Sequence, residues 1–352
     1  MLAGSCSPLS VLTAYLSPSV ARTILEMPVP KRDLYNVHLR PLAGARFQPT
    51  GFPDIGSALY DRPIGADQWE SCLLLESAQS MANHLEAQGW DSGTQQPVGA
   101  LTGLPYVRVL SLDGSYLTSS RTEAHRLAAG FVKDSTLDGI GMREVIRDRL
   151  GLRDDTPLAP RDIAAAVFAL DPLALVHGVF FAESARVWPG QPRIARALTS
   201  FVEAYDVRSV VSGGVKRDDV RHAVTGTGGA VEGYGFVPFH RTEYVARDIV
   251  ASFALDLDQL ASYGLTEPAT ELLATIARWE VRSLLDGGFR PRTACDLVMV
   301  EPGTDDAALH SLPALTARLA ELVLECRDLL GGGHALEVTW QGNKGKSKQQ
   351  AG

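Results

Sequence analysis

Hydrophobic and polar positions follow two periods along this chain, and the periods predict its strands and helices. Residues 35–40 alternate between apolar and polar, which predicts a strand, whereas apolar residues three and four apart around Met81 predict a helix. Extended segments are predicted at residues 35–40, 175–181, 207–211, 236–257, 295–300 and 336–340. Helices are predicted at residues 76–86, 192–205, 268–286 and 313–330, the third ended by Gly287 and Gly288.

Each predicted helix has one apolar face, which we expect to point into the core. These faces consist of Leu74, Ala78, Met81 and Leu85; of Ile194, Leu198 and Phe201; of Leu272, Ile276 and Trp279; and of Leu315, Leu319, Leu322 and Cys326. Residues 88–160 have a mixed pattern that predicts an insertion, and residues 212–235 predict a long glycine-rich loop. The order of elements is compatible with an α+β fold that has a ferredoxin-like (RRM-like) core and large insertions. A doubly wound α/β enzyme fits the pattern nearly as well, and periodicity alone does not select between them.

Length and charge narrow the class of protein only in part. A chain of 352 residues predicts two domains, or one domain with large insertions. Its net charge of -8 is unlike a protein wrapped in nucleic acid, although all but six of its 33 basic residues are arginines, which suit phosphate contacts. An arginine preference set by codon usage explains that bias equally well. Net charge describes the average surface, whereas an RNA groove needs only local positive potential.

The four cysteines, Cys6, Cys72, Cys295 and Cys326, are widely separated and predict reduced thiols. Residues 9–16 are mildly apolar, but no basic residue precedes them and they are too short to span a bilayer. We therefore expect a cytoplasmic protein without a membrane contact.

Motifs for catalysis are mostly missing from the sequence. It contains no HExxH, GxSxG or Walker motif and no Cys/His cluster at zinc spacing. Residues 226–231 begin like a dinucleotide loop, but Val231 replaces the third small residue that such a loop needs. His38, His84, His222 and His240 share no metal-binding spacing. We expect no metal, no cofactor and no catalytic residue.

Binding residues are predicted instead in a loop stiffened by Pro and Gly at residues 46–56 and on the polar face of the helix that follows. Phe47 and Phe52 have faces on which bases can stack, and burial in the core is an equally good interpretation of both. A plainly solvated face is the alternative for the helix. The complete set of predicted RNA-binding residues is Arg46, Gln48, Thr50, Phe52, Ser77, Gln79, Ser80, Asn83, His84, Lys216, Arg217, Arg221, His222, Arg241, Arg290 and Arg292.

Four motifs in this set resemble one family. They are the loop at residues 46–56, the helix at 76–86, the segments 212–216 and 234–244 that flank the glycine-rich loop, and residues 287–297. Together they resemble the backbone subunit of the type I-G (formerly I-U) CRISPR Cascade complex, a member of the RAMP superfamily. The resemblance implies a hand-shaped fold with an RRM-like palm at residues 35–87 and 163–340, fingers at 88–160 and a thumb loop at 207–236. A disordered tail is expected at residues 342–352.

The resemblance also implies a function. Several copies would stack along a CRISPR guide RNA (crRNA), together with other Cascade subunits, and present its bases to target DNA. No nuclease activity is implied, although Asp54, Asp218 and Asp219 are loop carboxylates of the kind that some RAMP subunits use to cut RNA. The alternatives are therefore an RNA-processing or target-RNA-cleaving RAMP nuclease and a nucleotide-binding metabolic enzyme. The net negative charge and the Asp218–Asp219 pair in the expected thumb depart from an RNA-coated protein.

Overall fold

The computed structural model describes residues 31–52, 56–216, 237–292, 295–300 and 309–342. Contacts divide the chain into two compact units, residues 1–32 and residues 33–352. Every element below belongs to the second unit, apart from Arg32 at the start of the first strand. The predicted tail, apart from Gly342, and the predicted dinucleotide-like loop lie outside the described residues.

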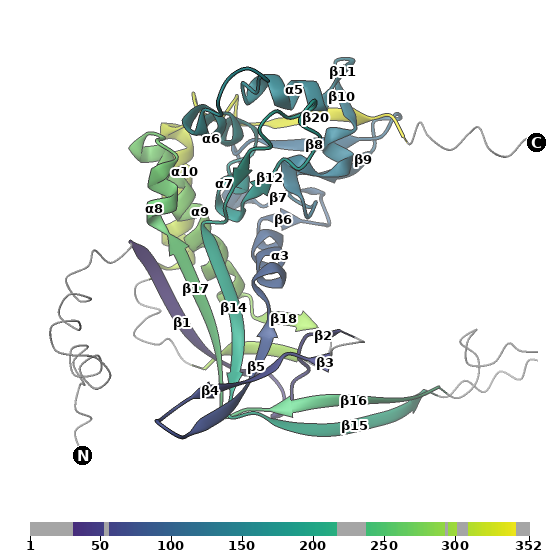
Figure 1. Ribbon diagram of the computed structural model, residues 1–352, viewed down its shortest axis with the longest axis vertical. Helices are drawn as coiled ribbons and strands as arrows, with labels where there is room; N and C mark the ends of the chain where they lie inside the picture. The colour runs from purple at the N-terminus through teal and green to yellow at the C-terminus, as the bar shows by residue number, and fades with distance from the viewer. Residues whose placement is uncertain (1–30, 53–55, 217–236, 293–294, 301–308, 343–352) are drawn as a thin grey trace, which may run out of the picture. The chain divides into compact units, whose positions relative to one another are not determined.

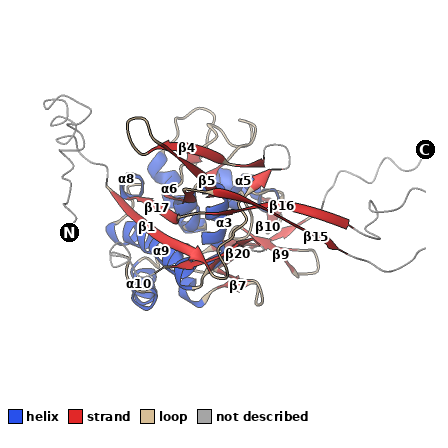
Figure 2. Ribbon diagram, turned by 90° about the horizontal axis from the view of Figure 1, so that it is seen from below, coloured by secondary structure: helices blue, strands red, loops and turns tan. Residues whose placement is uncertain are grey.

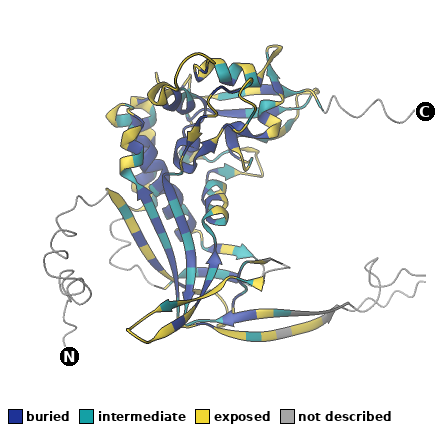
Figure 3. Ribbon diagram, viewed as in Figure 1, coloured by how far each residue is buried: buried dark blue, intermediate teal, exposed yellow. Residues whose placement is uncertain are grey.

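A seven-stranded sheet forms the largest layer of this unit (Figure 1). Its strands, in spatial order, are β18 (Phe289–Arg292), β19 (Cys295–Met299), β1 (Arg32–Pro41), β17 (Asp248–Asp256), β14 (Leu198–Tyr205), β5 (Trp69–Glu76) and β4 (Leu59–Pro63). The pairs β18–β19, β19–β1, β17–β14, β14–β5 and β5–β4 are antiparallel. Burial alternates along β1 (Figure 3), because Tyr35, Val37 and Leu39 point into the core. The predicted strand at residues 35–40 is thus confirmed.

Helices pack beside the sheet, two of them in contact with β14 and β17. They are α3 (Ala78–Gln88), α8 (Leu257–Ser262), α9 (Glu267–Asp286) and α10 (Leu312–Glu325). Helix α3 contacts β14 and α9, and α10 packs on α9. Leu272, Ile276 and Trp279 are buried as predicted, and α9 ends at its C-cap Gly287. These helices and strands confirm the α+β class.

A second, five-stranded sheet lies in the part of the unit that contains the expected fingers. Its strands, in spatial order, are β11 (Ile140–Gly141), β10 (Ser135–Leu137), β20 (Ala335–Trp340), β8 (Tyr106–Leu110) and β9 (Tyr116–Ser119). Strand β20 is parallel to β8 and antiparallel to β10, so a strand from the expected palm lies among strands of the expected fingers. The boundaries of palm and fingers stay predictions.

Shorter elements complete this unit. The helices are α4 (Gly130–Lys133), α5 (Met142–Arg149), α6 (Pro160–Leu170) and α7 (Leu173–His177), with 3₁₀ turns at Gly99–Leu101 and Arg126–Ala128. Two-stranded pairs are formed by β6 (Trp90–Asp91) with β7 (Gln96–Pro97), β12 (Val179–Phe180) with β13 (Arg193–Ile194), and β2 (Gly51–Phe52) with β3 (Gly56–Ser57). None of the described helices is both long and apolar enough to cross a membrane.

Strands β15 (Arg208–Lys216) and β16 (Val237–Val245) form a separate antiparallel ribbon, visible in Figures 1 and 2. Its register is unbroken from Arg208 opposite Val245 to Lys216 opposite Val237. The predicted loop at residues 212–235 therefore begins later than expected, because residues 212–216 continue the strand.

Two other predictions are wrong. Residues 175–181, predicted as a buried strand, contain the end of α7 and the short strand β12. Residues 192–205, predicted as a helix, contain β13 and β14 instead. Ile194, Leu198 and Phe201 have helical spacing, but every second residue of β14 is buried, and pairing with β17 and β5 selects the strand. Leu74 and Glu76, assigned to the helix, end β5.

Candidate nucleic-acid interface

The loop at residues 46–52 is attached to the rest of the fold at Phe47. This residue is 1% exposed, and its backbone exchanges two hydrogen bonds of 2.9 Å with Tyr244 of β16. Farther along the loop, the amide of Thr50 donates to the carbonyl of Leu75 over 3.2 Å. Burial in the core is therefore the correct interpretation of Phe47, and the side chain of Phe52 lies outside the described part of the structure.

Arg292 connects three of the four motifs. Its guanidinium forms an ion pair with the fully buried carboxylate of Glu76, at the end of β5. It also donates from Nη1 to the carbonyl oxygens of Gln48 over 3.0 Å and of Leu75 over 3.5 Å. Charged hydrogen bonds of this kind are among the strongest in proteins, and these fix the loop against β5 and β18. We call Gln48, Glu76 and Arg292 the Arg292 cluster.

His84 lies beside this cluster on α3. Its ring meets Phe289 edge to face, with 4.9 Å between centroids. Burial lowers the pKa of His84 below its usual value of 6.5, the nearby Arg292 lowers it further, and Glu76 opposes them. A neutral imidazole is therefore favoured in the folded protein.

The solvent-facing side of α3 carries the other predicted helix residues. Ser77 is the N-cap and accepts from the amide of Ser80 over 3.3 Å, so one lone pair of its hydroxyl is already used. Gln79 and Asn83, four residues apart, are exposed on one face. Figure 3 shows this mixture of exposed and half-buried positions along α3.

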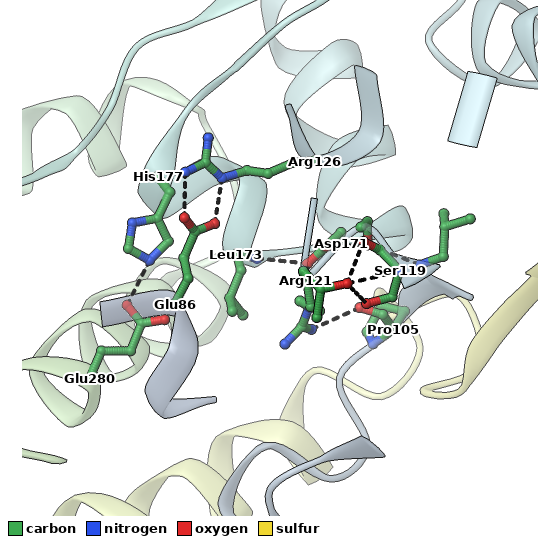
Figure 4. Close-up of polar contacts among 12 residues, drawn as sticks. Glu86, Pro105, Ser119, Arg121, Arg126, Asp171, Leu173, His177 and Glu280 are labelled. Atoms are coloured by element: carbon green, nitrogen blue, oxygen red, sulfur yellow. Dashed lines mark hydrogen bonds and ion pairs between the residues drawn. The ribbon is translucent and has the colours of Figure 1, made fainter. Parts of the chain in front are cut away.

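Two cavities lie along that face of α3. One of about 570 Å³ is lined by Gln79, and one of about 380 Å³ is lined by Asn83; Ala124 lines both. Beside them, Arg126 donates to both carboxylate oxygens of Glu86, over 2.6 and 2.7 Å (Figure 4). The polar face of α3 therefore faces the segment that contains Arg126 across cavities open to solvent.

A buried polar network supports the same segment. Arg121 is paired with Asp171 over 2.8 Å and donates to the carbonyl of Pro105 over 3.0 Å (Figure 4). Asp171 also accepts from the hydroxyl of Ser120 over 2.6 Å and from the amide of Leu173 over 3.2 Å. Complete burial raises the pKa of Asp171, and Arg121 opposes that shift. These contacts fix the segment before Arg126.

The remaining predicted residues lie at separate places. Arg46 is mostly exposed and pairs with Glu243 over 3.1 Å, Arg290 is exposed and lies 3.4 Å from Asp296, and Arg241 is half-buried opposite Ser212. Lys216 ends β15, but its side chain is not described. Arg217, Arg221 and His222, together with Asp54, Asp218 and Asp219, lie outside the described residues. The structure thus brings Gln48, His84 and Arg292 together and places Gln79 and Asn83 on another face of α3.

The basic residues Arg126, Arg193 and Arg196 around the larger cavity were missed by the sequence analysis as a site. They come from segments far apart in the chain, and no local motif marks them. Within the described residues, no three His, Cys, Asp or Glu side chains are grouped so that they could hold a metal ion.

Comparisons with known proteins found similarities to a protein family and to solved structures. A family model described as "CRISPR-associated protein GSU0053" matches residues 34–209, half of the chain. A solved structure titled "CRISPR RNA-guided surveillance complex, pre-nicking" has a chain that is 10% identical, with a TM-score of 0.34 over 71% of this chain and 68% of that one. A TM-score this low does not establish a shared fold. No curated protein matches the chain.

Proposed function

The chain belongs to the GSU0053 family of CRISPR-associated proteins, and from this we propose that it is a guide-RNA-binding backbone subunit of a type I Cascade surveillance complex. The observation that carries the proposal is the family match over residues 34–209, which includes β1, the loop at residues 46–52, α3 and β14. The four motifs that resemble the type I-G subunit support this subtype. In this role the protein would act in the cytoplasm, beside other Cascade subunits.

The order of strands in the large sheet supports an RRM-like palm. A ferredoxin-like core has the chain order β-α-β-β-α-β. Here β1, α3, β14, β17, α9 and β19 follow that chain order, and the four strands are neighbours in the sheet. In the same proposal the ribbon of β15 and β16 is the base of the thumb, and residues 88–160 contribute to the fingers.

A subunit that coats every guide must bind the RNA backbone without reading the bases. Gln79 and Asn83 suit this task because they are neutral, exposed and four residues apart on a rigid helix. Arg46 adds a cation whose side chain is 57% exposed, even with Glu243 beside it. We propose that these residues and the other predicted RNA-binding residues contact phosphates and sugars. The expected role is binding and presentation of the guide to target DNA, without catalysis by this subunit.

Repeated copies along one RNA need a surface that joins successive subunits without closing into a ring. The ribbon of β15 and β16 is the element that supports this part of the proposal, because it pairs with no strand of the seven-stranded sheet. We propose that it reaches a neighbouring copy in a filament along the guide.

The first test is to purify the protein without nuclease treatment, alone and together with the products of neighbouring CRISPR genes. We expect repeat-spacer RNA of uniform length in a large particle, detected by absorbance and sequencing. An RNA-free monomer in both preparations would contradict the proposal and favour the enzyme alternatives. RNA cut at one site, with cutting lost on substitution of a single Asp or His, would favour a nuclease.

A second test addresses the residues. Arg46→Ala and the double variant Lys216→Ala/Arg217→Ala should each weaken guide binding, and each lost phosphate contact should flatten the dependence of log K on log salt by about 0.7. Gln79→Ala/Asn83→Ala should weaken binding without changing that slope, since both residues are neutral. Arg149→Ala, an exposed arginine at the end of α5, is the control. Unchanged binding in all three variants would contradict the site assignment.

A further inference from the structure

The cavity of about 570 Å³ beside α3 is lined by basic residues and by no acidic one. Besides His177 at the end of α7, its described lining contains five residues that carry or can gain a positive charge: His125, Arg126, Lys133, Arg193 and Arg196. They come from the segment before α4, from α4, and from the region of β13 and the residues just after it. Gln79 of α3 completes the polar part of the wall. The cavity is therefore a place of local positive charge on an acidic protein.

Arg196 lies in this wall without a carboxylate among its described partners. Its guanidinium donates to the carbonyl of Ala78 over 2.8 Å and to the carbonyl of His177 over 3.5 Å. Burial lowers the pKa of Arg196, the charge of Arg126 nearby lowers it further, and Glu86 opposes these effects without outweighing them. Two cations in a half-buried wall repel each other, so the arrangement favours an anion between them.

Arg126 is held in a fixed position. Its backbone has φ = 51°, in the left-handed region that only a few per cent of residues other than glycine adopt. Its guanidinium is held by Glu86 (Figure 4) and by the carbonyl of Gly178, the latter over 2.9 Å. Strained backbone that the surroundings hold in place is often found at binding sites. Arg126 therefore contributes a pre-positioned charge, which Glu86 partly neutralises.

The other basic residues of the cavity wall differ in whether a carboxylate balances their positive charge. Lys133 is paired over 3.0 Å with Glu183, whose side chain does not line the cavity. Arg193 is exposed and lies 5.7 Å from the ring centroid of Phe180, with no described carboxylate partner. The free positive charge of the cavity thus comes mainly from Arg193 and Arg196.

His177 adds a buried polar group to the cavity wall. It lines the cavity and is 2% exposed, and its Nε2 lies 2.8 Å from Glu280 (Figure 4). Its Nδ1 is buried and has no hydrogen-bond partner among the described residues. Buried polar atoms are nearly always paired, so this nitrogen, on a residue of the cavity wall, has the capacity for one further hydrogen bond.

We propose that this cavity binds a phosphate group, with Arg193 and Arg196 as its main ligands. Guanidinium groups bind phosphate oxygens through paired hydrogen bonds, and the volume is ample for one phosphate with part of its nucleotide. That the phosphate belongs to an RNA strand rests on the function proposed above; a free phosphate or nucleotide is the other source. This site is separate from the Arg292 cluster and uses none of its residues.

The test compares Arg193→Glu with the control Arg327→Glu in the full-length protein. Arg193 is exposed, so its substitution should leave the fold intact, and Arg327 is an exposed arginine, 78% by side chain, away from the cavity. Arg196→Gln is the second variant. One arm measures binding of a fluorescent single-stranded RNA at several salt concentrations. The other measures binding of inorganic phosphate and of AMP by ³¹P NMR, with folding checked by circular dichroism.

With RNA as the source, Arg193→Glu should weaken RNA binding about tenfold or more and flatten the salt slope by about 0.7, while Arg327→Glu changes affinity less than twofold. With a free ligand as the source, phosphate or AMP should bind the unmodified protein and lose binding in both cavity variants, with RNA binding unchanged. Either result supports a phosphate site. If neither arm responds to Arg193→Glu or Arg196→Gln, the proposal is overturned. Phosphate binding in a protein that binds no RNA would refute only the RNA function.

Discussion

Removing the positive charge of Arg292 should destabilise the fold, because its partner Glu76 is 0% exposed. One oxygen of that carboxylate already has no hydrogen-bond partner among the described residues, so Arg292→Met would leave the whole group buried and unpaired. Breaking a buried ion pair from one side costs about 3–5 kcal/mol. The side chain of Arg292 is 22% exposed, so some water can reach the site. We therefore expect the free energy of unfolding of Arg292→Met to be lower by about 3 kcal/mol, the lower end of that range.

Substitutions on the other side of the pair should cost less. Glu76→Gln leaves Arg292 with its carbonyl partners Gln48 and Leu75 and with access to water. We therefore expect this variant to lower the free energy of unfolding by only about 1–2 kcal/mol. The double variant Glu76→Gln/Arg292→Met buries no charge and should be more stable than Arg292→Met alone. This order of stabilities separates the loss of an ion pair from a general disturbance of the loop.

The assay is urea unfolding followed by tryptophan fluorescence, with RNA binding measured on the same preparations. A loss below about 1 kcal/mol for Arg292→Met, or a double variant as unstable as the two single losses combined, would refute the reasoning. If Arg292→Met kept its stability but lost RNA affinity, its guanidinium would be an RNA ligand, as predicted from the sequence.

Three further predictions concern single groups. NMR titration should give His84 a pKa below its usual value of 6.5, and a pKa above 6.5 would contradict this prediction. Because the unfolded chain then binds the proton more tightly, the free energy of unfolding should fall as the pH drops from about 6.5 through the lower folded pKa, and His84→Gln should show a smaller fall. Phe47→Ala should lower the free energy of unfolding in urea by about 3–5 kcal/mol, because Phe47 is 1% exposed, whereas Phe47→Leu should lower it far less and leave RNA affinity unchanged. A stable Phe47→Ala protein with weak RNA binding would show that the ring stacks on a base. In a Cys6→Ser protein, Cys72, Cys295 and Cys326 should not react with a thiol reagent at pH 8 until urea is added, because all three are buried. Burial also raises the pKa of Cys295 to about 11, and rapid labelling of the native protein would disprove the prediction.

Local patterns predicted the elements whose burial follows a single period. The strand around Val37 and the helix with Leu272 and Ile276 are examples, because each has one buried face and clear ends. Leu198 and Phe201 misled the prediction, since a spacing of three residues suits one face of a helix. In β14 they point to opposite faces, with Leu198 buried and Phe201 half-buried, and pairing with distant strands selects the strand.

The sequence predicted the part of the candidate site that comes from one stretch of chain. It did not predict the parts that bring together residues from distant segments. The polar face with Gln79 and Asn83 is visible in one stretch of sequence, whereas the partner of Arg292 is a carboxylate 216 positions away. The basic cavity joins Arg126 to Arg196, and nothing in the sequence around either residue indicates the other. Pairing between distant charges depends on the folded chain, which a periodic pattern does not describe.

The five-stranded sheet cannot be completed during synthesis until strand β20, near the end of the chain, has emerged. Strand β20 lies between β10 and β8 in the five-stranded sheet, and Thr136 of β10 meets Thr339 of β20, 203 positions later. During synthesis at about 5–20 residues per second, the strands on both sides must therefore wait roughly ten seconds or longer for the strand that joins them. Their edges stay open for that time, and unpaired strand edges are the places where a chain can pair with the wrong partner, so slower elongation would lengthen this exposure.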